Sequence, residues 1–432
     1  HRSNAGVWRM IGYEADWVCP VSSAPIRNGA LAVESGRIVT VSSEAIPDGV
    51  ERVAYPGCAI LPGFVNAHAH LELTLFQGLL DGLSFPNWIA KLVRMKYQMC
   101  TRDALKVSAQ LGAIEMLRAG ITTVGEVMDV ETGWEAMREF GLQGVAYQEV
   151  FGPAPETAGQ ALQSLREKVT LHRQHETPTR RIGVSPHAPY SVSKNLYEGV
   201  RDYSRGEGLR MTAHIAESAD ETLFVRDGAG PFAESHRQRN IDVVPRRCLP
   251  VAYLDRLGLL GPDMLLIHAI ETDSADLGRI RDSGSFVAHC PKSNAKLGHR
   301  IAPVAAMRQR GVPVALGTDS VASNDAFDMF EEMRAVVAQQ HLPFDEVLRM
   351  ATAEGARALG LAGHLGSLEA GKRADFGIVA LHDAAINPVE DIIRSAHRSD
   401  VKATFVGGRE VDFDDRAIRQ EVRSVQARLR IA

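Results

Sequence analysis

The chain has 432 residues, of which 45% are hydrophobic and 23% are charged, and its formal net charge at pH 7 is −5. This length exceeds one small domain, and the composition is typical of a globular protein. Basic residues form no dense patch, and no apolar run approaches the roughly 20 residues of a membrane-spanning helix, so we expect neither a nucleic-acid nor a membrane partner.

The five cysteines are scattered along the chain and form no Cys-x-x-Cys pair. This spacing argues against a disulfide framework and against a thiolate metal site. The first ten residues, HRSNAGVWRM, also lack the apolar core of a secretory signal. We therefore expect a cytoplasmic protein.

Both ends of the chain contain short β-rich segments around turn residues. Residues 29–43, GALAVESGRIVTVSS, place two such runs around Ser35 and Gly36, which is a hairpin signal. Residues 366–381 and 401–411 show the same kind of pattern near the C-terminus. We predict that segments 1–61 and 365–432 are the two parts of one small accessory β-sandwich.

The middle of the chain, residues 62–364, alternates apolar β-rich runs with helical patterns. The helical pattern is clear in residues 103–120, where apolar positions form one face and Gly120 supplies a stop. Eight β–α units predict an α/β fold of the (β/α)8 TIM-like barrel type. The eight runs are GFVNAHAH, GITTVGEVMD, GVAYQEVFG, RIGVSPHAP, LRMTAHIAES, MLLIHAI, GSFVAHCP and VPVALGTDS.

Polar side chains gather at the predicted carboxyl ends of these strands, which is the face where barrels of this type build active sites. His68 and His70 are two residues apart on one strand, so their side chains point to the same side. One such histidine alone would more often be a packed residue, but several of them converge if the barrel forms. The set is His68, His70, His187, His214, Glu217, His268, His289 and Asp319.

Several imidazoles with a carboxylate and no thiolate suit Zn²⁺ or a similar first-row metal such as Fe²⁺. A bound metal of this kind lowers the pKa of a coordinated water from about 15.7 to about 7. Asp319 is placed to ligate the metal and accept the proton of that water, although an Asp here could instead cap a helix. Glu217 could move a proton to a leaving group, although the acidic run ESADE also permits a capping or surface role.

The ordered motifs PGFVNAHAHLE, HAPYSVS, HIAES, LLIHAI, HCPKSNAKLG and GVPVALGTDSVASND resemble the amidohydrolase superfamily. The chain is similar to its metal-dependent deaminase branch, which includes S-adenosylhomocysteine/methylthioadenosine deaminases, aminodeoxyfutalosine deaminases and triazine hydrolases. The resemblance implies that Glu217 is the proton shuttle and that His268 polarises the attacked centre or supports the metal-bound water. It also implies four metal ligands, which are His68, His70, His214 and Asp319.

The same resemblance implies substrate contacts from His187, Trp88, His289 and Asn294, with Ser293 in the same loop. Two segments depart from the methylthioadenosine deaminase pattern. No acid lies beside Trp88, where those enzymes place a glutamate that holds a ribose, and the connection around residues 228–248 is unusually long. These departures favour the aminodeoxyfutalosine-like subgroup.

We therefore expect a metal-dependent aminohydrolase that replaces the exocyclic amine of an adenine-type ring in a small, nucleoside-like substrate. One alternative is a hydrolase of another C–N or C–Cl bond, in a guanine-type base, a triazine or a cyclic amide. Another is a catalytically inactive metal-binding protein. We expect one metal per chain, because RIGVSPHAP offers no lysine to bridge a second ion and Lys194 lies too far along. A homodimer is compatible with the sequence.

Overall fold

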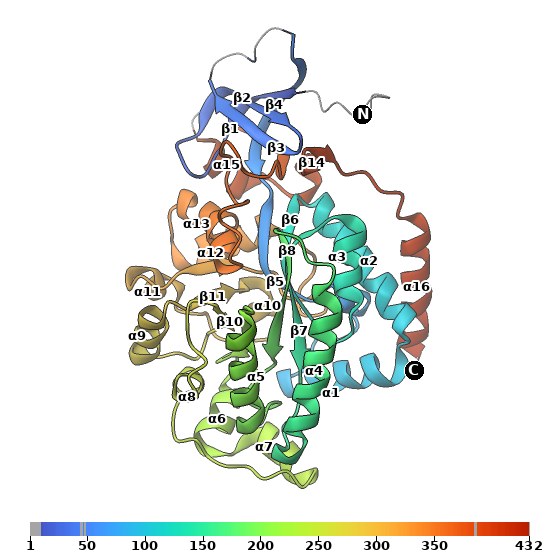
Figure 1. The fold of residues 1–432 in the computed structure, drawn as a ribbon, viewed down its shortest axis with the longest axis vertical. Helices are drawn as coiled ribbons and strands as arrows, with labels where there is room; N and C mark the ends of the chain where they lie inside the picture. The colour runs from blue at the N-terminus through green and yellow to red at the C-terminus, as the bar shows by residue number, and fades with distance from the viewer. Residues whose placement is uncertain (1–9, 44–45, 47–48, 384–386, 432) are drawn as a thin grey trace.

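The computed structural model describes residues 10–43, 46, 49–383 and 387–431, in which two β-sheets organise the chain (Figure 1). The expectation about the first ten residues therefore falls almost entirely outside the described part. All eight predicted barrel strands are present, and each is hydrogen-bonded to its neighbour in chain order. They are β5 (Phe64–Ala69), β6 (Ile121–Met128), β7 (Gln143–Val150), β8 (Arg180–Pro186), β9 (Met211–Ile215), β10 (Met264–His268), β11 (Phe286–His289) and β12 (Val314–Leu316).

The last barrel strand returns beside the first and is tied to it by polar groups. The backbone N–H groups of Thr318 and Asp319 donate to the carbonyl oxygen of His68 at 3.2 and 3.0 Å. The side chain of Asn66 donates to Oγ1 of Thr318 at 2.7 Å and accepts from its N–H at 3.0 Å. Gly317 permits this approach, because a Cβ there would lie 2.9 Å from the nitrogen of His68. The predicted barrel is confirmed.

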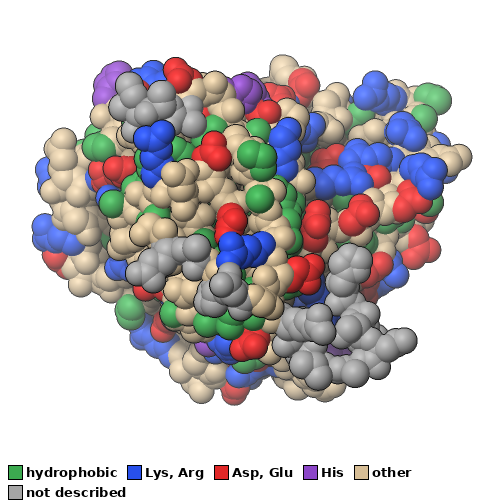
Figure 2. Space-filling model, turned by 90° about the horizontal axis from the view of Figure 1, so that it is seen from above, with side chains coloured by type: hydrophobic (Ala, Val, Ile, Leu, Met, Phe, Trp, Pro, Cys, Tyr) green, Lys and Arg blue, Asp and Glu red, His purple; other side chains and the backbone are tan. Residues whose placement is uncertain are grey.

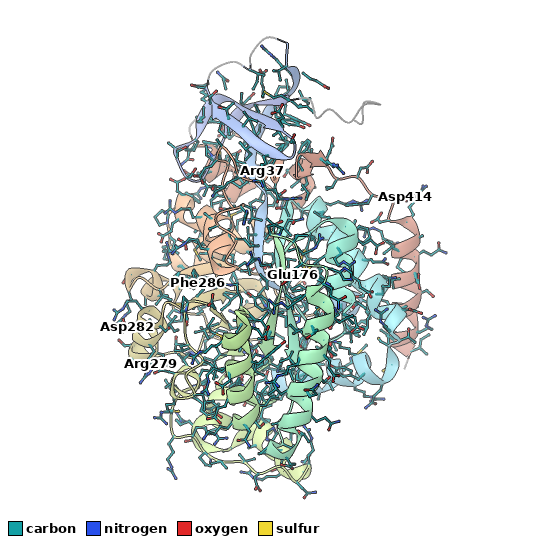
Figure 3. The ribbon with its side chains drawn as sticks, viewed as in Figure 1. Arg37, Glu176, Arg279, Asp282, Phe286 and Asp414 are labelled. Carbon is teal, nitrogen blue, oxygen red and sulfur yellow. The ribbon has the colours of Figure 1, made fainter. Side chains whose placement is uncertain are left out.

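Helices surround the barrel, and several begin at a side-chain cap. Thr101, for example, accepts a hydrogen bond from the N–H of Ala104 at the start of α2, the helix predicted at 103–120. Charged side chains such as Arg279 and Asp282 on α9 lie at the outer edge of the molecule (Figure 3). The barrel helices are α1 (Phe85–Arg94), α2 (Arg102–Arg118), α3 (Thr132–Phe140), α4 (Ala158–Arg173), α5 (Lys194–Glu207), α6 (Ala219–Asp227), α7 (Gly230–Gln238), α8 (Pro250–Arg256), α9 (Ser274–Ser283), α10 (Pro291–Lys296), α11 (Val304–Gln309), α12 (Met329–Gln340), α13 (Phe344–Met350) and α14 (Ala353–Ala358).

Short turns of helix complete these connections. The segment η1 (Leu71–Phe76) follows β5, and a π-helical turn, η2 (Met95–Met99), continues α1. Two further short turns are η3 (Pro155–Thr157) and η4 (Arg398–Asp400). Both η1 and η2 lie in the connection between the first two barrel strands.

Strands from both chain ends form a second sheet, as predicted. Its order is β15-β14-β13-β4-β1-β2-β3, so N-terminal and C-terminal strands pair directly through β4 and β13. The ring of Tyr13 packs edge-on against Phe376 and Phe405, with centroids 5.1 and 4.9 Å away, which gives the two ends a common core. The strands are β1 (Ile11–Val18), β2 (Ile26–Glu34), β3 (Arg37–Ser42), β4 (Glu51–Pro62), β13 (Phe376–Ala380), β14 (Val401–Val406) and β15 (Arg409–Glu410).

This sheet lies at the end of the molecule opposite α6 and α7 (Figure 1). Arg37 on β3 lies where the second sheet meets the barrel, and it donates to the carbonyl oxygen of Gly371 at 2.7 Å (Figure 3). On the end face that carries the sheet, basic and acidic side chains are interspersed (Figure 2). In the described part of the chain, no helix combines the length and apolar character needed to cross a membrane.

Two helices occur in the C-terminal segment, for which only strands were predicted. They are α15 (Pro388–Ser395) and α16 (Arg416–Ile431). The helix α16 runs along the flank of the barrel (Figure 1). It buries Val422, Val425 and Leu429, and Gln426 donates to the carbonyl oxygen of Leu75 at 2.9 Å. The C-terminal segment thus contacts the barrel as well as the second sheet. The predicted domain boundaries at 61/62 and 364/365 therefore stay a prediction.

Candidate active site

The four predicted metal ligands come together at the carboxyl ends of β5, β9 and β12. The ring centroid of His68 lies 4.8 Å from that of His70 and 4.9 Å from that of His214. Oδ1 of Asp319 lies 3.3 Å from Nε2 of His68 and 3.5 Å from Nε2 of His70. Three imidazoles with one carboxylate form a donor set that suits a divalent metal ion, Zn²⁺ in particular.

The hydrogen bonding of these imidazoles leaves nitrogen atoms free to bind a metal. Nδ1 of His70 contacts the carbonyl oxygen of Val127 at 2.9 Å, which turns Nε2 toward Asp319. Both ring nitrogens of His68 and Nδ1 of His214 are buried without a hydrogen-bond partner among the described residues. Such buried, unpaired nitrogens are rare unless they bind an ion or water, so the residues present fit a metal.

Burial also sets the protonation of these imidazoles. It lowers the pKa of His70 to about 3 and the pKa values of His68 and His214 below their ordinary value. These imidazoles are therefore neutral, which is the form that binds metals. Burial alone would raise the pKa of Asp319, but the imidazoles of His68, His70 and His268 beside it hold that pKa well below its usual range.

Asp319 is held in its position by strong local constraints. Its backbone φ is +58°, a left-handed conformation that is uncommon for residues other than glycine. Oδ2 accepts hydrogen bonds from the hydroxyl groups of Ser293 and Ser323, both at 2.7 Å. The cap of the next helix, α12, is Asp328, so the alternative role of Asp319 as a helix cap is not the one observed.

Glu217 is buried beside the predicted metal ligands. Its Oε1 lies 3.5 Å from Nε2 of His268 and 3.5 Å from Nε2 of His299. The cap of α6 is Ser218, and the carboxylate of Glu221 accepts the N–H groups of Ala216 and Glu217. The capping role considered for Glu217 therefore belongs to its neighbours, and the carboxylate of Glu217 faces the cavity.

A cavity of about 580 Å³ opens above these residues and is large enough for a nucleoside-sized molecule. Its apolar wall includes Tyr190 and Phe232, whose rings stack with centroids 4.0 Å apart. Among the residues that line it are His70, Phe85, Trp88, Lys96, Tyr97, Asp129, Glu149, His187, His214, Glu217, His268 and Asp319.

Two of the four predicted substrate contacts, Trp88 and His187, line this cavity. Burial lowers the pKa of His187 to about 4, and its Nδ1 lies 2.6 Å from Oγ of Ser191. Asn294 lies behind the wall, where its Oδ1 is 2.9 Å from Nδ1 of His268. His289 is also buried, and it is not among the residues that line the cavity. For Asn294 and His289, direct contact with a substrate stays a prediction.

Among the residues of the site that were not predicted are six polar ones. Asp129 directly follows the second barrel strand, and Glu149 is the last residue but one of the third. The search for polar residues at the carboxyl ends of strands, which found the histidines, could therefore have found them too. His299, Ser323, Lys96 and Tyr97 lie in helices and loops, where no periodic pattern marks them.

Comparisons with known proteins show that the chain is similar to several deaminases. It is 34% identical over 427 residues to a 5-methylthioadenosine/S-adenosylhomocysteine deaminase of Syntrophobacter fumaroxidans, covering 93% of this chain and 92% of that protein. An adenosine deaminase of Xanthomonas campestris, solved with bound zinc, superposes with a TM-score of 0.86 and 27% identity, covering 98% and 99% of the two chains. A Helicobacter pylori aminofutalosine deaminase, solved with methylthio-coformycin, has the same fold, with a TM-score of 0.82, 22% identity and coverage of 94% and 100%.

The enzyme class follows from these relationships. The names of the relatives confirm the predicted class of hydrolase, which acts on carbon–nitrogen bonds other than peptide bonds. The model of the amidohydrolase family matches residues 59–411, which include the whole barrel and part of the second sheet. The chain belongs to the amidohydrolase family.

Proposed function

We propose that this protein is a zinc-dependent aminohydrolase that replaces the exocyclic amine of an adenine-type ring by oxygen and releases ammonia. The observation that carries the proposal is the placement of Glu217. Its carboxylate is buried between His268 and His299, at the edge of a metal-binding cluster and facing a cavity of nucleoside size. Deaminase relatives that span nearly the whole chain support the same reaction.

The residues of the site have separate tasks in this reaction. A divalent metal held by His68, His70, His214 and Asp319 would supply Lewis acidity and a water of lowered pKa. Glu217 protonates the ring nitrogen next to the amine-bearing carbon, which makes that carbon electrophilic. Asp319 accepts the proton of the attacking water and passes it to the departing amine.

His268 acts on the attacked carbon. Its Nδ1 is fixed by Asn294 at 2.9 Å, so Nε2 points toward Glu217 and the cavity. Because Oδ1 of Asn294 accepts from the N–H at Nδ1, an N–H at Nε2 belongs to the doubly protonated ring, and in that form it stabilises the charge that develops when the trigonal carbon becomes tetrahedral. Asn294 therefore serves as a positioning residue for His268.

We further propose one metal ion per chain. A second ion in such a barrel would need a bridging ligand at the end of the fourth strand, β8. The residues there are Ser185 and His187, while Lys194 lies at the start of α5 and pairs with Glu198 at 3.7 Å.

The described cysteines are all unpaired, which suits a reducing compartment such as the cytoplasm.

The test is a substrate panel with metal-replete enzyme. Adenosine, 5′-methylthioadenosine, S-adenosylhomocysteine and aminodeoxyfutalosine are compared with a guanine-type base, a triazine and a cyclic amide. We expect ammonia release with an adenine-to-hypoxanthine change in absorbance for at least one of the first four. Turnover only of the other compounds would overturn the substrate assignment and favour hydrolysis of another C–N or C–Cl bond.

A further inference from the structure

The wall of the cavity next to β6 and β7 carries a group of polar side chains that the proposed reaction does not use. Lys96 forms ion pairs with Glu72 and Asp129, and the hydroxyl of Tyr97 donates to Asp129. Asp129 also accepts the N–H of Val130 at 2.8 Å. Because these contacts occupy both oxygens of Asp129, this part of the wall is already satisfied without a ligand.

Glu149, at the end of β7, is different. Its side chain is 6% exposed and lines the cavity, yet its Oε1 is buried with no hydrogen-bond partner in the described chain. The nearest polar ring atom, Nε2 of His187, lies 3.9 Å away, which is too far for a hydrogen bond. A buried carboxylate oxygen without a donor is costly, so Oε1 of Glu149 calls for a donor that comes from the cavity.

The electrostatic surroundings of Glu149 point to a neutral donor. Burial raises the pKa of Glu149 well above its usual range, and the negative charges of Asp129 and Glu72 act in the same direction, whereas Lys96 opposes them. A phosphate or carboxylate would add negative charge to this acidic wall. Hydroxyl groups, by contrast, can donate to the carboxylate and stabilise its ionised form without adding charge.

The position of Glu149 relative to Glu217 fits a nucleoside. The strands β7 and β9 are separated only by β8, which carries His187 between them. Their side chains converge inside the barrel, where a carboxylate oxygen of Glu149 and ring nitrogens of His187 and His214 all lie within 4.8 Å of one another. With the ring at Glu217 and His268, the group attached to the ring extends past His187 toward Glu149.

We propose that Glu149 binds the vicinal hydroxyl groups of a ribose-like sugar attached to the ring, and so makes the enzyme selective for nucleosides. The inference rests on the proposed deaminase function, because it needs the ring to occupy the metal-side end of the cavity. A vicinal diol supplies two O–H donors to one carboxylate, which matches the chemistry that the wall lacks.

The experiment compares a nucleoside with its diol-free analogue. The wild-type, E149A and E149Q proteins are assayed with adenosine or 5′-methylthioadenosine, whichever turns over faster, and with the 2′,3′-dideoxy form of the same compound. We expect E149A to lower kcat/KM about 10- to 100-fold for the nucleoside, the size typical of hydrogen bonds to a charged group. The value for the dideoxy analogue should stay within about twofold, and E149Q should be intermediate.

Control measurements separate this role from others. The variant E198A, on the outer face of α5, should leave both values unchanged, and metal content should stay the same in all the proteins. Equal losses for both substrates in E149A and E149Q would overturn the proposal, because they would indicate a structural or catalytic role.

Two other outcomes would also overturn it. Glu149, His187 and His214 lie close enough together to hold an ion. A loss of one of two bound equivalents in E149A would therefore assign Glu149 to a second metal site. If the wild-type enzyme deaminates no nucleoside at all, the proposed function itself fails, and the sugar site fails with it.

Discussion

Oγ of Ser323 lies 2.7 Å from Oδ2 of Asp319, on the side of the carboxylate that faces away from His68 and His70. Oγ of Ser293 donates to the same oxygen at 2.7 Å. The two hydroxyl groups therefore occupy Oδ2, and Oδ1 is the oxygen that we propose binds the metal. Groups that orient metal ligands in this way are often nearly as important as the ligands themselves.

Removal of these hydroxyl groups should weaken metal binding. We expect S323A and S293A each to lower the affinity for zinc about 10- to 100-fold, because Asp319 loses a donor that fixes its orientation. The measurement is a competition titration against a chelator. S283A, which removes a hydroxyl on the outer helix α9, serves as the control, and unchanged affinity in both site variants would contradict the account.

Loss of a ligand should abolish both metal binding and activity. We expect H68A and D319A to retain less than about a tenth of an equivalent of metal under conditions where the wild type approaches one. The reason is that the loss of one ligand strongly lowers the affinity for zinc. Metal analysis of purified, metal-saturated protein checks this. H397A, which changes an exposed histidine that caps η4, should retain full metal content. Two tightly held equivalents in the wild type would contradict the single-metal proposal.

Substitution of Glu217 should separate metal binding from chemistry. E217Q keeps the size and most of the hydrogen bonding of the side chain but cannot transfer a proton. We therefore expect normal metal content and a decrease in kcat of about 10²- to 10⁴-fold. Steady-state kinetics with the best nucleoside provide the test. A variant within a few-fold of wild type would show that Glu217 does not transfer the proton.

A pH effect on stability should come from Asp375, far from the metal. Burial raises the pKa of this residue from 3.8 to about 6, although Arg373 and the N–H of Gly407 oppose the shift. The folded state therefore binds the proton more tightly than the unfolded state. Protonation of Asp375 therefore contributes fully to the stability of the fold below about pH 4, and this contribution is lost as the pH rises to about 6.

The variant D375N removes this titration. The free energy of unfolding of D375N relative to wild type should rise by on the order of 3 kcal/mol between pH 4 and pH 7. Denaturant unfolding of both proteins in the presence of EDTA, which removes the contribution of the metal, measures the difference. Parallel pH profiles for the two proteins would show that Asp375 has no raised pKa in the folded state.

The barrel could be predicted because its strands are buried on both faces. In such strands nearly every residue is apolar, as in Met264–His268, where all five are buried. The polar residue that ends each run then marks the catalytic face, which is how His68, His214 and Asp319 were found. These features are local in the sequence, so a single chain is enough to locate them.

The parts that were missed depend on contacts between distant segments. His299 reaches Glu217 from a loop after α10, and nothing near Glu217 in the sequence indicates this partner. Likewise, the lack of donors around Glu149 can be recognised only when the surrounding side chains are placed. The helix α16 is a different case, because Ile418, Val422, Val425 and Leu429 repeat at helical spacing and already indicate an apolar helix face.

The central claim is that ammonia release from an adenine-type nucleoside requires the metal bound by His68, His70, His214 and Asp319. Its most direct test is reconstitution of metal-stripped enzyme with increasing zinc, with ammonia and the hypoxanthine-type product measured at each step. The account predicts no turnover without metal, a linear rise that ends at one equivalent per chain, and equal amounts of the two products. Full activity in the metal-free protein, or product formation without ammonia, would contradict it.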